Sequence, residues 1–285
     1  MIGAEAFAKV NLGLRVGSRS DDGFHPIEGV FQSVRIADRL VLAAAEQDTV
    51  TSPSGSPVID GMDNLAFRAA AAVRKRVASR QPLAITLEKS IPAAAGLGGG
   101  SADAAAGLAL AGRFFGVDDT LLVGLAAELG SDVPFCLRGG TARVTGRGDL
   151  VEPLDPLSGF SLAIAVPPVE IATPAAFRKW DELGEPAGLR MSLSMLPPAL
   201  RSQGDLYNDL YPASVALAPE LDDWRGELER AWGRPVMLSG SGPSLYGFFV
   251  DCDEANGAAA AAPIGTRFAE ACELVPRGWR FTEDT

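Results

Sequence analysis

Hydrophobic and polar positions alternate near the start of the chain. Val10, Leu12, Leu14 and Val16 are separated by mostly polar or small residues, and alternation with a period of two predicts a strand. Segments of strand-like composition recur along the sequence, at residues 27–36, 39–44, 82–89, 141–145, 160–166, 234–240 and 244–250. The opening of the chain is therefore predicted to form a β-meander.

Helical patterns occur between these strands. Residues 63–78 carry apolar side chains along one face, with Asp63 as the expected N-cap. Further helices are predicted at residues 101–115 and 120–129, after Thr173, and at residues 205–217 and 219–231. Strands and helices mix without a regular βαβ rhythm, which favours an α+β fold over a doubly wound sheet.

The segment between Gly146 and Gly159 is rich in Gly, Pro and Asp, a composition typical of a domain boundary. A chain of 285 residues is long enough for about two domains. We therefore expect an N-terminal domain at residues 1–152 and a C-terminal domain at residues 153–285.

Composition narrows the class of protein. Hydrophobic residues make up 47% and charged residues 21%, so the chain can bury a sizeable core. It has no uncharged apolar run of the roughly 18 residues needed for a membrane span, and its start lacks a signal-peptide pattern. Three widely separated cysteines fit a reducing compartment. These features predict a cytoplasmic enzyme without a membrane partner.

Charge and histidine content exclude further classes. The net charge of −11 argues against a nucleic-acid partner, which would need a basic surface. A pocket made locally positive by a few cations and backbone amides could still bind a phosphorylated small molecule. With His25 as the single histidine, a multi-histidine metal site is impossible. No G-x-S-x-G elbow accompanies it, which argues against a Ser-His-Asp hydrolase.

A glycine-rich stretch, IPAAAGLGGGSADAAAGL, runs from Ile91 to Leu108. It lacks the sixth-position glycine of a dinucleotide fingerprint and the G-K-[ST] ending of Walker A. Here a predicted strand leads into a loop whose unpaired backbone N–H groups lie at the N-terminus of a helix, and such a site favours the binding of an anion. The same glycines could simply permit a tight turn, with Ser101 capping the helix that follows. Asp103, in the first turn of that helix, could interact favourably with the helix dipole or could help to hold Mg²⁺. The loop alone leaves these alternatives open.

Further motifs give the loop a context. In chain order they are AFAKVNLGLRV (6–16), DDGFHPIEGVFQSV (21–34), PAAAGLGGGS (92–101), GSDVPF (130–135), ATPAAF (172–177) and SGSGPS (239–244). Together they resemble the GHMP kinase superfamily. The pairing of A-K-V-N-L with D-G-F-H is most similar to the members that act on a cytidine diphosphate-linked methylerythritol. The resemblance covers both halves of the chain.

The resemblance implies a fold and a reaction. The N-terminal domain would resemble domain 2 of ribosomal protein S5, and the C-terminal domain would be ferredoxin-like. The reaction would transfer the γ-phosphoryl group of ATP, with Mg²⁺, to a hydroxyl of the methylerythritol moiety. Lys9 would stabilise the charge of the transferring group, and Asp132 would accept the hydroxyl proton. Without the resemblance, Lys9 could reach solvent and Asp132 could cap a turn.

The resemblance also assigns the binding residues. Phe24 and Phe177 would sandwich the cytosine ring, His25 would read its edge, Asn11 would bind the methylerythritol group and Thr173 the cytidine side. ATP would contact Asn64, Lys89, Pro92, Gly96, Leu97, Gly98, Gly99, Gly100, Ser101 and Gly240. Many members have a second serine after Ser101, where this chain has Ala102, so the Mg²⁺ ligands stay unassigned.

Three other functions compete with this interpretation. A homoserine or mevalonate kinase would have no use for the set of Phe24, His25 and Phe177. A non-catalytic nucleotide sensor would not need both Lys9 and Asp132. A dehydrogenase would need the missing sixth glycine of the fingerprint.

Overall fold

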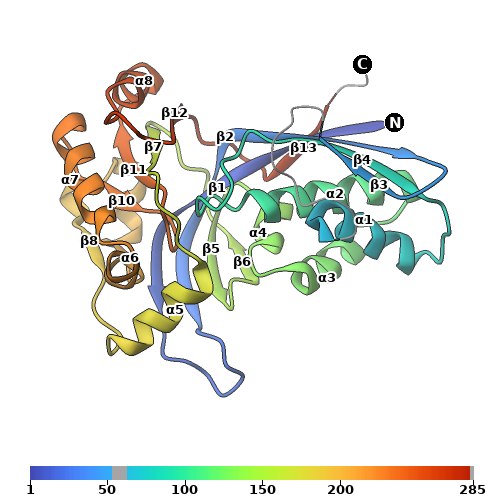
Figure 1. Ribbon diagram of the computed structural model, residues 1–285, viewed down its shortest axis with the longest axis horizontal. Helices are drawn as coiled ribbons and strands as arrows, with labels where there is room; N and C mark the ends of the chain where they lie inside the picture. Colours follow the sequence, from blue (N-terminus) through green and yellow to red (C-terminus); the bar gives the residue numbers. More distant parts are fainter. Residues whose placement is uncertain (53–62, 283–285) are drawn as a thin grey trace.

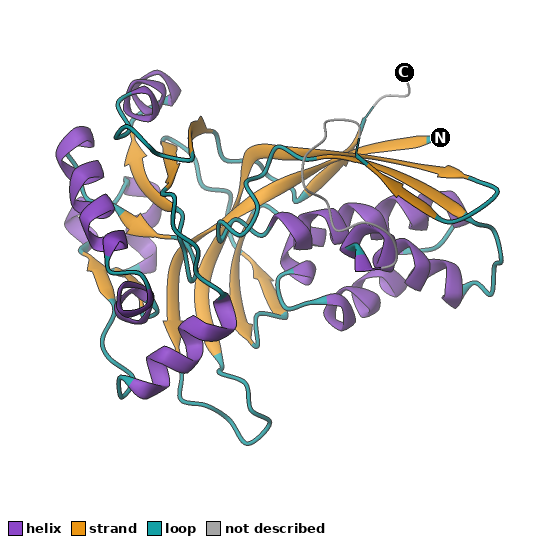
Figure 2. Cartoon of the chain, viewed as in Figure 1, coloured by secondary structure: helices purple, strands orange, loops and turns teal. Residues whose placement is uncertain are grey.

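The computed structural model describes residues 1–52 and 63–282, and within them the chain forms two β-sheets flanked by helices (Figures 1 and 2). The larger sheet has nine strands in the described part of the chain, and the smaller sheet has four. Strands and helices do not alternate regularly along the sequence. The predicted α+β class is confirmed.

The larger sheet is built around two long antiparallel strands, β1 (Ile2–Val16) and β2 (Ile27–Ala44). Its hydrogen-bonded order is β3-β4-β2-β1-β9-β8, with β13 on β1 and β5 between β2 and β6. The bounds of these other strands are β3 Thr49–Thr51, β4 Leu83–Glu88, β5 Thr141–Gly146, β6 Leu150–Pro153, β8 Leu189–Met191, β9 Leu206–Asn208 and β13 Trp279–Phe281. The second half of the chain thus adds three strands to the sheet that its first half begins.

The smaller sheet has the order β10-β11-β7-β12. Its strands are β7 Ser161–Val166, β10 Met237–Leu238, β11 Leu245–Phe249 and β12 Phe268–Cys272. Figure 1 shows one group of helices against the larger sheet and another beside the smaller sheet. The first group is α1 Leu65–Arg76, α2 Gly99–Phe115, α3 Asp119–Leu129 and α4 Val133–Arg138; the second is α5 Thr173–Glu182, α6 Tyr211–Leu217, α7 Glu220–Trp232 and α8 Cys252–Ala260. Short 3₁₀ turns cover Leu193–Met195 and Pro198–Gln203.

The predicted break between strands 27–36 and 39–44 is wrong, because β2 is continuous. Val34 pairs with Ala8 of β1 whereas Ala37 pairs with Phe7. Arg35 and Ile36 therefore form a bulge, which interrupts the alternating pattern without ending the strand.

Helix boundaries also differ from the prediction. Helix α1 is capped by Asn64 instead of Asp63, since the Asn64 carboxamide oxygen accepts hydrogen bonds from the amides of Ala66 and Phe67. Helix α2 starts at Gly99, two residues before the predicted start. The predicted helix at 205–217 begins with β9, and the motif at residues 130–135 contains the start of α4.

Helix α2 lies at the centre of the first group of helices. Its residues from Ala102 to Gly112 are buried, and most of them are alanine or glycine. A Cβ atom on Gly107 would lie 2.6 Å from the carbonyl oxygen of Ala66. The small side chains therefore allow the backbones of α2 and α1 to approach closely. This close packing fixes the start of α2 against the sheet.

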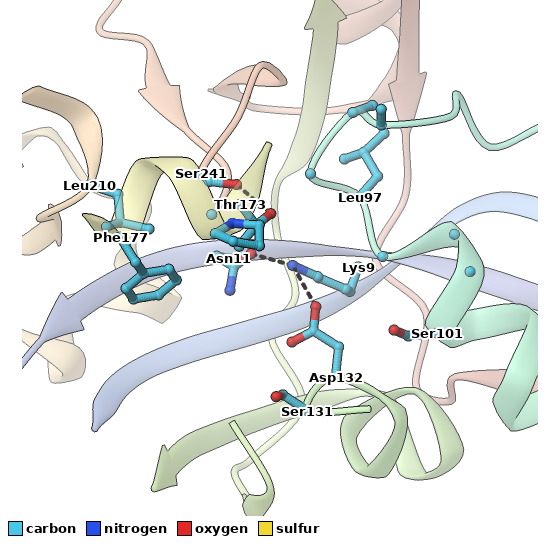
Figure 3. Close-up of a pocket in the computed structure, with 18 of the residues that line it drawn as sticks. Lys9, Asn11, Leu97, Ser101, Ser131, Asp132, Thr173, Phe177, Leu210 and Ser241 are labelled. Atoms are coloured by element: carbon cyan, nitrogen blue, oxygen red, sulfur yellow. Dashed lines mark hydrogen bonds and ion pairs between the residues drawn. The ribbon is translucent and has the colours of Figure 1, made fainter. Parts of the chain in front are cut away.

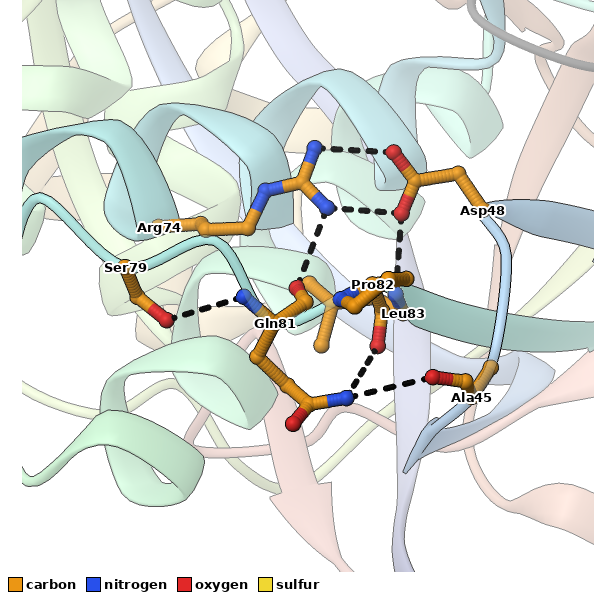
Figure 4. A network of polar contacts seen from close by, with 7 residues as sticks. All are labelled: Ala45, Asp48, Arg74, Ser79, Gln81, Pro82 and Leu83. Atoms are coloured by element: carbon orange, nitrogen blue, oxygen red, sulfur yellow. Dashed lines mark hydrogen bonds and ion pairs between the residues drawn. The ribbon is translucent and has the colours of Figure 1, made fainter.

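A polar network joins the β2–β3 connection to α1 and β4 (Figure 4). Asp48 accepts hydrogen bonds from both terminal nitrogens of Arg74, at 2.6 and 2.9 Å, and from the amide of Leu83 at 2.9 Å. The hydrogen bonds from Arg74 lower the pKa of Asp48. The network anchors the end of α1 to the edge of the sheet.

Candidate active site

A pocket of about 880 Å³ lies where the two sheets and their helices meet. It is lined by every residue for which the sequence predicted a role: Lys9, Asn11, Phe24, His25, Asn64, Lys89, Pro92, Gly96, Leu97, Gly98, Gly99, Gly100, Ser101, Asp132, Thr173, Phe177 and Gly240. Segments far apart in the sequence therefore contribute to one cavity. None of the helices in residues 1–52 and 63–282 is both long and apolar enough to cross a membrane.

Lys9 lies in the middle of the pocket wall. Its ammonium group is 2.6 Å from the side-chain oxygen of Asn11 and 3.1 Å from a carboxylate oxygen of Asp132 (Figure 3). Lys9 is 5% exposed, so its side chain does not reach bulk solvent. Strand β1 supplies Lys9 and Asn11 two residues apart, on one face of the sheet.

Asp132 reaches Lys9 from the start of α4. It stands at the N-cap position, but its side chain makes no capping hydrogen bond. The carboxylate is instead directed to the ammonium of Lys9 (Figure 3). The alternative that Asp132 merely caps its turn is therefore wrong.

The glycine loop is shaped by contacts within the protein. Gly98 has a φ of +70°, and a Cβ there would lie 2.8 Å from Cγ of Lys9. Gly96 has a φ of +79°, and a Cβ there would lie 2.8 Å from the carbonyl oxygens of Ser239 and Gly242. Only glycine accepts both this backbone conformation and this proximity. The loop lies against Lys9 on one side and against the second glycine turn on the other.

The second glycine turn, residues 239–242, ties the two halves of the site together. The Ser239 hydroxyl accepts a hydrogen bond from the backbone N–H of Asn11 at 3.2 Å and donates one to the carbonyl oxygen of Gly96 at 3.3 Å. The Ser241 hydroxyl lies 2.8 Å from that of Thr173 at the start of α5 (Figure 3). The turn therefore fixes the glycine loop, β1 and α5 relative to one another.

A buried charge cluster lies behind the glycine loop. Lys89 pairs with Asp38 and, at 2.6 Å, with Asp103 of α2. Asp38 also accepts hydrogen bonds from the amides of Ser90 and Ile91. Burial raises the pKa of Asp103 to about 7, although Lys89 partly offsets this effect. Asp103 is therefore engaged by Lys89, not merely placed for the helix dipole.

The far end of the pocket is aromatic. The rings of His25 and Phe177 are stacked, with centroids 5.2 Å apart and an angle of 24° between their planes. Phe24 is 51% exposed, and the guanidinium of Arg147 lies 4.5 Å from the centroid of its ring. Arg147 is also paired with Asp22.

The sequence analysis missed several residues of the pocket. They are Arg19, Ser131, Arg147, Arg178, Asp181 and Ser241, together with apolar lining residues such as Leu14 and Leu210. Ser131 and Ser241 lie inside motifs that had been singled out. The three arginines and Asp181 lie in segments whose pattern gives no signal, because only the tertiary fold brings them to the cavity.

The two-sheet fold, the glycine loop and the Lys9–Asp132 pair are the features expected of a GHMP kinase, and the comparisons with known proteins show that the chain is one. Residues 64–140 match the family GHMP kinases N terminal domain. A solved homoserine kinase from Cytophaga hutchinsonii, 19% identical, superposes with a TM-score of 0.71 over 99% of this chain and 97% of its own, which supports the fold.

Closer relatives identify the family. A 4-diphosphocytidyl-2-C-methyl-D-erythritol kinase of Corynebacterium efficiens is 38% identical over 90% of this chain and 87% of its own. The 4-diphosphocytidyl-2-C-methyl-D-erythritol kinase of Moorella thermoacetica is also 38% identical, over 88% of this chain and 91% of its own. A solved structure of 4-(cytidine 5'-diphospho)-2C-methyl-D-erythritol kinase has 34% identity and a TM-score of 0.80, over 95% of this chain and 98% of its own. The chain belongs to the family of 4-diphosphocytidyl-2-C-methyl-D-erythritol kinases.

Proposed function

We propose that the protein transfers the γ-phosphoryl group of ATP to a hydroxyl of 4-diphosphocytidyl-2-C-methyl-D-erythritol, which gives the 2-phosphate. This is a step of the non-mevalonate route to isoprenoid precursors. The names of the relatives supply the substrate. The observation that carries the proposal is the pair of the buried Lys9 and the half-buried Asp132, which lies between the glycine loop and the aromatic end of one pocket.

Asp132 would act as the base of the reaction. Its carboxylate would accept the proton of the substrate hydroxyl as that oxygen attacks the γ-phosphorus. Because Asp132 makes no capping hydrogen bond, Lys9 and the incoming hydroxyl are its natural partners. The contact with Lys9 keeps the carboxylate oriented toward the centre of the pocket.

Lys9 would stabilise the transferring group. Its ammonium carries three protons, and its contacts with Asn11 and Asp132 use two of them. The third can be directed at an oxygen of the γ-phosphoryl group or at the attacking oxygen, where negative charge is shared in the transition state. The accepting oxygen of Asn11 is turned to Lys9, which leaves its NH₂ group to donate to the methylerythritol moiety.

The glycine loop would hold the phosphates of ATP. The first N–H groups of α2, at Gly99, Gly100 and Ser101, have no intrahelical acceptor, because the first intrahelical hydrogen bond runs from Ala102 to the carbonyl oxygen of Gly98; such free N–H groups favour an anion. Pro92, Gly96, Leu97 and Gly98 would shape this wall of the site. Asn64, Lys89 and Gly240 would lie around the rest of the nucleotide.

The residues present fit a Mg²⁺ ion that is bound mainly through phosphate. The described residues contain no group of three or more His, Cys, Asp or Glu side chains arranged to hold a metal. Mg²⁺ bound with nucleotides usually takes one or two protein ligands, with phosphate oxygens and water in the other positions. The Ser101 hydroxyl would be one such ligand, and the bound ion would neutralise charge on the β- and γ-phosphates.

The aromatic end of the pocket would bind the cytidyl group. Phe24 and Phe177 present flat faces on which a neutral base can stack. His25 would read the edge of the base, and Thr173 would contact the cytidine side. The surrounding arginines would suit the diphosphate that links the base to the methylerythritol.

Two broader assignments accompany the proposal. We keep the domain boundary after residue 152, one residue before the end of β6 and within the Gly- and Pro-rich segment. We also assign the enzyme to the cytoplasm, which its three unpaired cysteines favour.

A substrate panel tests the proposal. ADP release would be measured with ATP and, separately, the cytidyl substrate, homoserine or mevalonate. We expect turnover with the cytidyl substrate and none above background with the other two. Turnover of homoserine or mevalonate at a comparable kcat/KM would contradict the assignment, because neither alcohol can use the aromatic end of the pocket.

A further inference from the structure

Asn208, the last residue of β9, holds the second glycine turn from outside the pocket. Its NH₂ group donates hydrogen bonds to the carbonyl oxygens of Leu238 at 2.8 Å and Gly240 at 2.9 Å. Its side-chain oxygen accepts a hydrogen bond from the backbone N–H of Leu210 at 3.0 Å. Asn208 is 1% exposed and lies outside the lining of the pocket. Its carboxamide is therefore used for contacts within the protein, not for a ligand.

Asn208 is itself fixed to the strand that carries Lys9. It pairs in parallel with Leu14 of β1. The next residue, Asp209, donates its backbone N–H to the carbonyl oxygen of Leu14 at 2.9 Å, and its carboxylate accepts a hydrogen bond from the N–H of Val16 at 3.0 Å. Strand β1 therefore determines where Asn208 meets the turn.

The backbone of Gly240 lies close to the centre of the pocket. Its φ is +59°, and a Cβ there would lie 3.0 Å from Oδ1 of Asn11 and 3.8 Å from Nζ of Lys9. A carbonyl oxygen readily accepts a proton from an ammonium group. If the peptide between Gly240 and Ser241 rotated, its oxygen could reach Lys9. The hydrogen bond from Asn208 opposes this rotation.

Ser214 of α6 holds the next peptide in the same way. Its hydroxyl donates a hydrogen bond to the carbonyl oxygen of Ser241 at 3.0 Å, and Ser214 is fully buried. The segment that runs from β9 into α6 thus binds the carbonyl oxygens of Leu238, Gly240 and Ser241. Because a carbonyl oxygen would repel a phosphoryl group, engaging these oxygens within the protein favours phosphate in the pocket.

We propose that Asn208 is a positioning residue for phosphoryl transfer, which keeps the carbonyl oxygen of Gly240 away from the ammonium of Lys9. The contacts of Lys9 with Asn11 and Asp132 leave one ammonium proton for the transferring group. A carbonyl oxygen that accepted this proton would remove stabilisation of the transition state. This inference rests on the proposed function.

The test compares the wild type with Asn208→Asp. Aspartate has nearly the same shape, but its carboxylate cannot donate and would repel the carbonyl oxygens of Leu238 and Gly240. We expect kcat with ATP and the cytidyl substrate to fall by at least about tenfold, with KM for the cytidyl substrate within about threefold of wild type. A role limited to stability would leave kcat per folded molecule unchanged, and circular dichroism would measure the folded fraction.

Two further variants make the test specific. Ser214→Ala adds no charge and removes a single hydrogen bond, so it should fold. We expect its kcat to fall by about threefold with little change in KM. Thr141→Val is the control, because the buried Thr141 donates a 2.6 Å hydrogen bond to Oε1 of Gln32 and lies outside the lining of the candidate active site. It should retain wild-type kcat.

The outcomes separate the inference from its alternatives. Wild-type kcat per folded molecule in Asn208→Asp would overturn it, and so would an equal fall in Thr141→Val. If Asn208→Asp does not fold, wild-type kcat in Ser214→Ala overturns the inference, whereas the expected fall supports it. If the wild type does not phosphorylate the cytidyl substrate, the proposed function itself fails, and the two failures are thereby distinguished.

Discussion

The side chain of Lys9 occupies the space that a side chain on Gly98 would fill. A Cβ on Gly98 would lie 2.8 Å from Cγ and 3.0 Å from Cε of Lys9, at a φ of +70°. Gly98→Ala must therefore displace the ammonium from Asp132 as well as strain the loop. We expect kcat to fall by at least about tenfold, with a loss of stability of about 1–2 kcal/mol, measured by steady-state kinetics and urea unfolding.

Gly124→Ala is the matched control for Gly98→Ala. Gly124 lies within α3, and a Cβ there would have no atom within 4 Å. We expect unchanged kinetics and a gain of about 0.5–1 kcal/mol from helix propensity. Wild-type kcat in Gly98→Ala would show that Lys9 can move without consequence, which would contradict the role of the contact.

Lys9→Met and Asp132→Asn should each remove most of the activity. Met suits the apolar strand and Asn keeps the shape of the carboxylate, so both variants should fold. Lys9→Met removes the cation that would stabilise the charge of the transferring phosphoryl group, and Asp132→Asn removes the acceptor for the hydroxyl proton. We expect kcat to fall by at least about a hundredfold, with smaller changes in KM. The exposed Lys75 provides a control, and Lys75→Met should retain wild-type kcat. Near-normal turnover in Lys9→Met or in Asp132→Asn would exclude the role assigned to the residue that was replaced.

Asp103 should make the stability of the protein depend on pH. Its pKa is raised from 3.8 to about 7 by burial, so the folded state binds more protons than the unfolded state between these values. The stabilising effect of this proton is complete below about pH 4 and is lost as the pH rises through about 7. In Asp103→Asn, the free energy of unfolding should therefore decline less over this range. Urea unfolding at several pH values measures the free energy of unfolding. If this free energy changed equally with pH in the wild type and in Asp103→Asn, the prediction would be contradicted.

Asp48 should stabilise the protein in the opposite pH range. Hydrogen bonds from Arg74 lower its pKa, so its contribution is present above about pH 4 and is lost as the pH falls below this value. Asp48→Ala leaves the amide of Leu83 and the guanidinium of Arg74 without this acceptor. We expect a loss of about 1–3 kcal/mol at neutral pH, and less at acid pH. Glu227→Ala, at an exposed position on α7, should cost under about 0.5 kcal/mol; an equal loss there would refute the role of the network.

The sequence could predict most of the residues that line the pocket because they lie in the motifs that carry the family resemblance. Lys9 interrupts an apolar strand, Asp132 lies two residues after a glycine, and the glycines precede an alanine-rich helix. The function of the glycines was only partly predicted. At Gly96 and Gly98 the close neighbours are protein atoms from β1 and from the second glycine turn, which no local pattern reveals.

Other features depend on contacts between distant segments. Asp38 is a charged residue inside a strand, and only the fold shows that it binds the amides of Ser90 and Ile91. The bulge at Arg35 was interpreted as a strand end because a bulge and a turn interrupt alternation in the same way. Asp181 has no motif of its own, since its partner His25 lies in the first quarter of the chain.

The most direct test of the central claim follows both products of the reaction. The purified protein would be incubated with Mg²⁺, ATP and 4-diphosphocytidyl-2-C-methyl-D-erythritol, and ADP release would be compared with the mass of the cytidyl product. The proposed function predicts one ADP for each substrate molecule that gains a phosphoryl group on its methylerythritol moiety, and background ADP release without that substrate. ADP release that does not depend on the cytidyl substrate, or a cytidyl compound of unchanged mass, would contradict it.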